Sequence, residues 1–193
     1  MRLVVGITGA SGAIFGIRTL QELKALNVET HLVISKWART TIAHETSYSI
    51  SDVEALATQV HHPDNQAASL SSGSFRTDGM IVAPCSMKTV AAIRAGFGDS
   101  LISRAADVTL KERRRLVLMV RESPLSEIHL DNMLTLARMG TIILPPMPAF
   151  YSKPKSLGEM VDHIVGRVLD QFSLDMPGMN RWDGFEGNAS QTR

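Results

Sequence analysis

The chain has 193 residues, of which 44% are hydrophobic and 5% aromatic, and its formal net charge is +1. This length suits one main domain with an aliphatic core, and the balanced charge argues against binding to nucleic acid or to an anionic membrane surface. The single cysteine, Cys85, excludes an intrachain disulfide and favours a reducing compartment. No apolar run approaches the roughly 20 residues that span a bilayer, and none has the form of a signal peptide, so we expect a cytoplasmic protein.

The chain opens with a predicted strand, Leu3–Thr8, that turns on Gly9 and Gly12 into a helix predicted over Ala13–Leu26. Such a turn directs backbone N–H groups and the positive end of a helix dipole at one spot, which suits a phosphate. The glycine spacing matches neither a dinucleotide fingerprint, which also needs a ribose-binding acid, nor a P-loop with its Gly-Lys-Ser/Thr. The turn therefore predicts a nucleotide-like ligand of another kind, with a ligand-free tight turn as the alternative.

Further along the chain, short aliphatic runs alternate with helical patterns. The remaining strands are predicted at Glu29–Ser35, Gly79–Ala83, Arg115–Val120 and Thr141–Leu144. The remaining helices are predicted at Lys36–Glu45, Met87–Ala95, Leu101–Lys111, Ser126–Met139 and Leu157–Phe172. Because the strands are apolar throughout rather than alternating, both faces of the sheet should be covered. The predicted fold class is therefore α/β: a doubly wound, mostly parallel sheet of Rossmann-like type with helices on both faces.

Two segments lack this regular pattern. Residues 61–74 are polar and rich in turn-forming residues, which predicts a mobile surface loop. We assign residues 1–172 to a single α/β domain and residues 173–193 to an irregular C-terminal tail, in which Trp182 is expected to contact this subunit or a neighbour.

The segments that follow the predicted strands are candidates for a ligand site, because open α/β sheets bind ligands outside the carboxyl ends of their strands. Five such segments are rich in Gly, Ser, Pro or charge, and we expect them to converge on one crevice. They are Gly9–Gly12, Ser35–Lys36, Pro84–Thr89, Arg121–Glu122 and Pro145–Lys153. Within the third, Ser86 and Thr89 offer hydroxyl donors, although an N-cap role for Ser86 explains the pattern equally well.

Charged side chains cluster around the fourth predicted strand. Arg121 and Glu122 follow it directly, whereas Arg104 and Lys111 are seven residues apart on roughly one face of the preceding helix. Such a cationic set suits a phosphorylated substrate, and ordinary surface solvation is the alternative for Lys111. We interpret Cys85 as a packed thiol, since no histidine is predicted beside it. The six histidines show no metal-ligand spacing, so no metal site is predicted.

Several motifs together resemble one family, the UbiX-like flavin prenyltransferases, formerly described as phenylacrylic acid or aromatic acid decarboxylases. The motifs are GITGASGA (6–13), LVISKWA (32–38), PCSMKT (84–89), RAADVTLKERR (104–114), VRESPLSEIHLDNM (120–133) and AFYSKP (149–154), together with Arg167. They extend over most of the chain, and the block at residues 104–133 is the most specific. The resemblance implies that the domain at residues 1–172 binds a flavin.

Members of this family transfer a dimethylallyl group from dimethylallyl phosphate to N5 and C6 of reduced FMN, without a metal. The product, prenylated FMN, serves a separate UbiD-like aromatic acid decarboxylase. The resemblance implies this prenyltransferase activity here, in a homododecamer with sites between subunits. Two alternatives stay open: an FMN-dependent decarboxylase acting directly on an aromatic acid or a peptidyl-cysteine, and a non-catalytic flavin-binding module. Against the cysteine type, Lys88 stands where those enzymes favour asparagine.

The resemblance also assigns site residues by position. FMN would be held by Gly9, Ala10, Ser11, Ser35, Ser86, Met87, Lys88, Thr89 and Arg121. The prenyl phosphate would be surrounded by Arg104, Lys111, Arg121, Glu122, Tyr151 and Arg167. The implied catalytic residues are Ser11, Glu45, Arg121, Glu122 and Tyr151. Ser11 and Glu45 would transfer protons near N5, and Glu122 would protonate the departing phosphate. Positioned Arg, Lys and Tyr donors stabilise charge on an ionising allylic phosphate without a metal.

Overall fold

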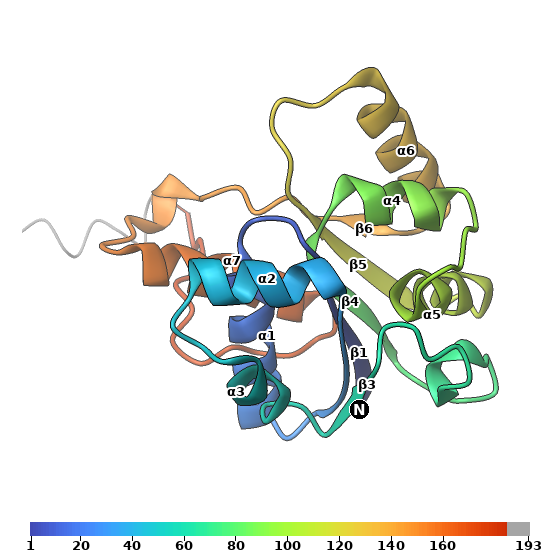
Figure 1. Cartoon of the computed structure of the whole chain (residues 1–193). Coiled ribbons are helices and arrows are strands. Elements are labelled where there is room, and N and C mark those ends of the chain that lie inside the picture. The colour runs from blue at the N-terminus through green and yellow to red at the C-terminus, as the bar shows by residue number, and fades with distance from the viewer. Residues whose placement is uncertain (185–193) are drawn as a thin grey trace, which may run out of the picture. The chain divides into compact units, whose positions relative to one another are not determined.

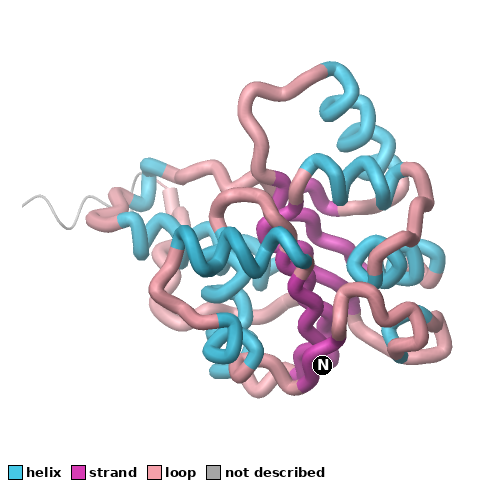
Figure 2. The backbone as a smooth tube through the Cα atoms, viewed as in Figure 1, coloured by secondary structure: helices cyan, strands magenta, loops and turns pink. Residues whose placement is uncertain are grey.

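The computed structural model describes residues 1–184 and divides into two compact units, residues 1–146 and residues 147 onward. The first unit contains a six-stranded parallel sheet in the order β3-β2-β1-β4-β5-β6 (Figure 1; Figure 2). Its strands are β1 (Arg2–Ile7), β2 (Glu29–Ile34), β3 (Gln59–His61), β4 (Gly79–Cys85), β5 (Arg115–Val120) and β6 (Ile142–Ile143).

Helices connect the strands of the first unit. They are α1 (Ala13–Ala25), α2 (Lys36–Glu45), α3 (Ile50–Glu54), α4 (Met87–Arg94), α5 (Leu101–Lys111) and α6 (Glu127–Arg138), with a 3-10 turn η1 at Ser69–Ser71. The second unit contains the 3-10 turn η2 (Phe150–Ser152) and helix α7 (Leu157–Asp170). Among residues 1–184, no helix combines the length and the apolar character needed to cross a membrane.

The core of the first unit lies on both faces of the sheet. On one face, Val4, Met80 and Leu116 pack in a buried cluster with residues of α4 and α5, such as Val90 and Ile102. On the opposite side of the same strands, alternate residues are equally buried, as are the apolar residues Ile17, Leu20 and Leu23 of α1. Burial of all seven residues of β4 explains why this strand is continuously apolar. The predicted doubly wound α/β fold is confirmed.

Serine side chains begin most of the longer helices. The hydroxyl oxygens of Ser35, Ser86, Ser100, Ser126 and Ser156 each accept a hydrogen bond from a backbone N–H three residues later. Such caps satisfy N–H groups that have no partner within the helix, so these helix starts follow directly from local sequence. Helix α1 is the exception, because its N-cap is Gly12, which has no side chain to accept such a bond.

Every predicted strand and helix is present, with ends within two residues of the predicted ones. The prediction missed α3 and β3, which lie in the polar stretch after α2. Helix α3 has only five residues, and β3 has three at the edge of the sheet, so neither displays a full period of apolar residues.

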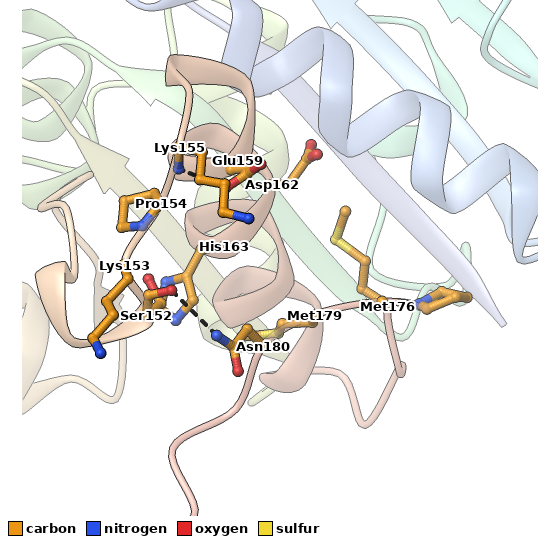
Figure 3. Close-up of a pocket in the computed structure, with 12 residues that line it drawn as sticks. Ser152, Lys153, Pro154, Lys155, Glu159, Asp162, His163, Met176, Met179 and Asn180 are labelled. Atoms are coloured by element: carbon orange, nitrogen blue, oxygen red, sulfur yellow. Dashed lines mark hydrogen bonds between the residues drawn. The ribbon is translucent and has the colours of Figure 1, made fainter. Parts of the chain in front are cut away.

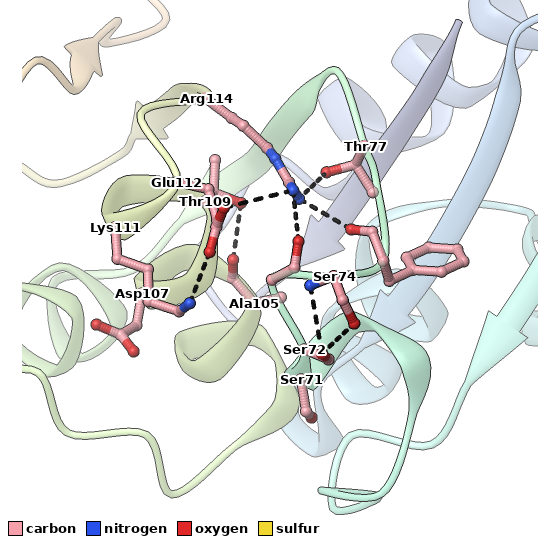
Figure 4. A network of polar contacts seen from close by, with 12 residues as sticks. Ser71, Ser72, Ser74, Thr77, Ala105, Asp107, Thr109, Lys111, Glu112 and Arg114 are labelled. Carbon is pink, nitrogen blue, oxygen red and sulfur yellow. Dashed lines mark hydrogen bonds and ion pairs between the residues drawn. The ribbon is translucent and has the colours of Figure 1, made fainter.

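The surface loop predicted over residues 61–74 is present, but it contains the 3-10 turn η1 and is tied to the core at several points. Its mobility stays a prediction. His61 ends β3 and is buried, with its Nε2 2.9 Å from Nδ1 of His31. Leu70 is buried in the core, and the Arg104 guanidinium donates to the carbonyl of Ser71 at 3.1 Å. Arg114 donates to the Gly73 carbonyl at 2.6 Å (Figure 4). Backbone carbonyls of this segment are thus bound by distant arginines, which composition alone does not reveal.

Candidate functional site

The candidate site begins where strand order reverses, between the adjacent strands β1 and β4. In doubly wound sheets the chain leaves two such strands in opposite directions, which opens a crevice at their carboxyl ends. Thr8 joins the two strand ends here. Its buried hydroxyl donates to the Pro84 carbonyl at 2.7 Å and accepts from the Ser86 N–H at 2.9 Å. The turn after β1 and the start of α4 are therefore held together.

Two glycines of the first turn are required by its geometry. Gly12 has a φ of 99°, a left-handed conformation that most side chains disfavour. A Cβ on Gly9 would lie 2.6 Å from Cβ of Trp37, closer than packed carbon atoms approach each other. The glycine pattern in the sequence thus reflects a tight turn and its close packing against α2.

An anion does occupy the N-terminus of α1, and it is the carboxylate of Glu45, the last residue of α2. Glu45 Oε2 accepts from the N–H groups of Gly12 at 2.8 Å and Ala13 at 3.0 Å. Partial burial opposes ionisation, but hydrogen bonds from the Ser11 hydroxyl and the two N–H groups outweigh it. Together with the charge of Arg121, they lower the pKa of Glu45 below its ordinary value. The sequence predicted a phosphate at this helix end, whereas the chain supplies its own negative charge there.

Two other helix starts at this edge present hydroxyl groups. Ser35 follows β2, with its N–H donating to the Ile7 carbonyl at 3.0 Å and its side chain capping α2. At the start of α4, the hydroxyl oxygens of Ser86 and Thr89 lie 3.1 Å apart. Met87 is buried in the core, whereas Lys88 is exposed. The structure thus places Ser35, Ser86 and Thr89 at helix starts that flank the end of β1.

Arg121 and Glu122 lie at the end of β5, as predicted. The Arg121 N–H donates to the Cys85 carbonyl at 3.2 Å, which joins the ends of β5 and β4. Both side chains are exposed, and Glu122 Oε1 accepts from the Ser123 N–H at 3.1 Å. Cys85 itself is fully buried, and burial raises the pKa of its thiol, which agrees with a packed rather than a nucleophilic cysteine.

Lys111 does not lie with Arg121 in this chain. Lys111 ends α5, four residues before β5 begins, whereas Arg121 follows the last residue of β5. A strand of this length spans about 20 Å, so the two cations lie near opposite ends of the sheet. Lys111 Nζ pairs with Glu112 at 2.7 Å (Figure 4). Arg104 Nη1 pairs with Asp107 at 2.9 Å. Within one chain, therefore, Lys111 and Arg121 do not lie around the same phosphate.

Tyr151 and Arg167 belong to the second unit, so the segment at residues 145–153 that was expected to join the crevice spans the boundary between the units. Arg167 Nη1 pairs with Asp170 at 2.8 Å. The Tyr151 hydroxyl lies 3.3 Å from Nε2 of His163, and the Tyr151 ring meets Trp182 edge-on at 5.4 Å. Trp182 therefore contacts its own subunit, one of the two expected outcomes.

His163 is a neighbour of Tyr151 that the sequence analysis did not single out. It lies on α7 one turn before Arg167 and lines a cavity of about 290 Å³ with Lys155, Asp162 and Asn180 (Figure 3). Burial, and then the charge of Arg167, lower the pKa of His163. Its spacing of four residues from Arg167 is the one signal in the sequence that could have indicated it. Within residues 1–184, no group of three or more His, Cys, Asp or Glu side chains is arranged to hold a metal ion.

Comparison with known proteins agrees with this geometry. The flavoprotein family model matches residues 1–169. A Bacillus subtilis protein named a probable UbiX-like flavin prenyltransferase is 64% identical over 186 residues, covering 96% of this chain and 91% of the relative. A crystal structure from Escherichia coli O157:H7, described as a dodecameric FMN-dependent UbiX-like decarboxylase, is 62% identical with a TM-score of 0.94, covering 95% of this chain and 100% of that one.

A second solved structure, of AnUbiX (PadA1) in complex with FMN and dimethylallyl pyrophosphate, also has a TM-score of 0.94. It is 61% identical and covers 95% of this chain and 98% of that one. Identity at this level over nearly the full length of both proteins is specific to a family and not merely to a fold. The chain therefore belongs to the flavoprotein family and, within it, to the UbiX-like flavin prenyltransferases.

Proposed function

We propose that this chain transfers a dimethylallyl group from dimethylallyl phosphate to N5 and C6 of reduced FMN. The observation that carries the proposal is the Glu45 carboxylate, which the first turn keeps ionised at the switch point of the sheet. In a storage module for flavin, an ionised carboxylate there would serve only to cap the helix. A transfer that replaces a ring proton does need such a group.

The turns at the carboxyl edge fit an FMN ligand. Glu45 already neutralises the N-terminus of α1, so a phosphate there would meet a like charge. We therefore assign the FMN phosphate to the hydroxyl and N–H donors around Ser35 and Ser86–Thr89, and the flavin ring to the side of the first turn. The residues that would hold FMN are Gly9, Ala10, Ser11, Ser35, Ser86, Met87, Lys88, Thr89 and Arg121.

Reduced FMN supplies the nucleophilic N5 and C6 atoms in this proposal. Glu45, with Ser11 as its hydrogen-bonded partner, accepts the N5 proton as the bond between N5 and the allyl carbon forms. It returns that proton to the double bond of the attached group and accepts the C6 proton as the bond to C6 forms. Arg121, Tyr151 and Arg167 donate to the oxygens of the prenyl phosphate, where negative charge develops as the carbon–oxygen bond breaks. Glu122 gives a proton to the departing phosphate. No metal takes part in this scheme.

Arg104 and Lys111 enter the proposal through a second copy of the chain. About 20 Å of strand separates Lys111 from Arg121, so Lys111 cannot reach the same phosphate from within one copy. A homododecamer, the assembly named for the Escherichia coli relative, offers such sites between subunits. We propose that Arg104 and Lys111 complete the phosphate site of a neighbouring copy in a cytoplasmic assembly. Its product would serve a UbiD-like decarboxylase.

A single experiment tests the activity. The protein is incubated without oxygen with reduced FMN and dimethylallyl phosphate, and the released flavin is weighed by mass spectrometry. The expected product is FMN carrying one five-carbon unit, which activates a separately purified apo-decarboxylase. In parallel, the protein with reduced FMN receives hydroxybenzoates and hydroxycinnamates, and no carbon dioxide is expected. Robust release of carbon dioxide without a partner, or unmodified flavin, would overturn the proposal in favour of a decarboxylase or a binding module.

A further inference from the structure

The Tyr151 ring contacts two aromatic side chains of its own unit. His163 meets it edge-on, with ring centroids 5.7 Å apart at an interplanar angle of 81°. Trp182 meets it at 5.4 Å and 70°. Edge-to-face pairs of this kind are the favoured arrangement of aromatic rings. The two contacts therefore limit the orientations open to Tyr151, although its side chain is about half exposed.

The Tyr151 hydroxyl is directed at His163 by this packing. The oxygen lies 3.3 Å from Nε2, at the long end of the hydrogen-bond range. Contacts between catalytic groups commonly lengthen in ligand-free structures and shorten when substrate binds. His163 and Arg167 are four residues apart on α7, so they share one face of the helix. Tyr151, His163 and Arg167 therefore form one connected set within residues 147–184.

The surroundings of His163 favour its neutral imidazole. Burial lowers its pKa first, and the positive charge of Arg167 lowers it further, while Asp170 opposes the shift. A neutral imidazole carries one N–H and one acceptor nitrogen, so two arrangements are available. If Nε2 is the acceptor, the Tyr151 proton is directed at His163, and the phenol has no proton left for another group. If Nε2 carries the proton, the phenol accepts from His163 and its own O–H stays available.

An anionic phosphate can bind only the second arrangement, because its oxygens accept hydrogen bonds and donate few. We propose that His163 is a positioning residue for Tyr151: its Nε2–H donates to the phenol oxygen, and the Tyr151 O–H is thereby directed to the prenyl phosphate. Donation into the phenol oxygen also strengthens the O–H as a donor, since hydrogen bonds in a chain polarise one another. The inference rests on the proposed function, in which Tyr151 binds that phosphate.

A double-mutant cycle measures this coupling. His163→Phe keeps an aromatic ring against Tyr151 but removes the hydrogen bond, while His163→Gln keeps an N–H donor at a similar distance. Loss of one neutral hydrogen bond is expected to lower kcat/KM for dimethylallyl phosphate about three- to tenfold in His163→Phe. His163→Gln should recover to within about twofold of wild type. In a Tyr151→Phe background the same His163→Phe change should have almost no further effect.

Affinity for FMN should be equal in all variants, which separates a local change from misfolding. The exposed His62→Phe serves as a matched control and is expected to behave as wild type. If the His163→Phe loss is just as large without the Tyr151 hydroxyl, His163 does not act through it and the inference is wrong. If neither wild type nor the control adds a five-carbon unit to FMN, it is the proposed function that fails.

A second readout does not depend on activity. Nitrogen-15 NMR of the FMN-bound protein distinguishes the two neutral forms of each of the six histidines, and His163→Phe identifies the signals of His163. The expected result is a protonated Nε2 near neutral pH, with a shift that changes in Tyr151→Phe. A proton on Nδ1 would direct the phenol O–H to His163 and overturn the inference, whatever the activity.

Discussion

Replacing Glu45 by glutamine removes the negative charge that the N-terminus of α1 binds. Wild-type Glu45 accepts from the N–H groups of Gly12 at 2.8 Å and Ala13 at 3.0 Å. Glutamine keeps a carbonyl acceptor but loses the charge, so charge-assisted bonds become neutral ones and the interaction with the helix dipole is lost. At an exposed helix end the loss should be about 1 kcal/mol in the free energy of unfolding.

The assay is urea unfolding of both proteins at equal concentration, where this loss lowers the midpoint by roughly 0.3–0.5 M. The difference should depend on pH. The pKa of Glu45 is lowered on folding from an ordinary value of 4.5, so its ionisation stabilises the fold fully above that value. The stabilisation disappears as pH falls through the lowered pKa, and glutamine does not titrate. The gap between the two proteins should therefore be full at pH 7 and close in strong acid.

The same substitution tests the proposed catalytic role. Affinity for FMN should be retained, since the FMN phosphate is assigned to Ser35 and Ser86–Thr89, while prenylation should slow by about a hundredfold or more. Asp64→Asn, at a side chain that is 82% exposed, is the control and should alter neither property. A stability gap of equal size at pH 3 and pH 7 would refute the electrostatic reasoning. Prenylation at the wild-type rate in Glu45→Gln would remove Glu45 from the mechanism.

Two further predictions concern the prenyl phosphate. Arg167→Ala should retain FMN but lose about ten- to a hundredfold in kcat/KM for dimethylallyl phosphate, because one charge-assisted hydrogen bond is removed; the exposed Arg76→Ala is the control. Unchanged saturation with dimethylallyl phosphate would remove Arg167 from the site. Lys111→Ala should be similarly impaired. If each site takes Lys111 from one copy and Arg167 from another, co-expression of the two variants should restore roughly a quarter of wild-type activity, because about a quarter of the sites then contain both wild-type residues. Mixed assemblies as inactive as their parents would place both residues in one copy.

The sequence by itself determined the fold class and the family. Continuous apolar strands, helices begun by serine caps and the glycine turn are local features, and local interactions set them: each serine hydroxyl binds an N–H only three residues away. The motif blocks were sufficient to identify the family. The 64% identity with a probable UbiX-like flavin prenyltransferase, over nearly the full chain, agrees with that assignment. The placement of Arg121 and Glu122 also followed from the sequence, because they come directly after an apolar strand, β5, of a parallel sheet.

Tertiary structure decided which distant groups meet. Glu45 fills the N-terminus of α1 because α2 ends opposite that turn, and no local pattern in the sequence pairs the two. The polar segment at residues 61–74 is held by arginines of α5 and of the turn before β5, and by the buried contact between His31 and His61. Lys111 and Arg121 are near in sequence, yet one strand length separates them. Hydrogen bonds and ion pairs depend on distance in space, which sequence spacing encodes only within a single helix or turn.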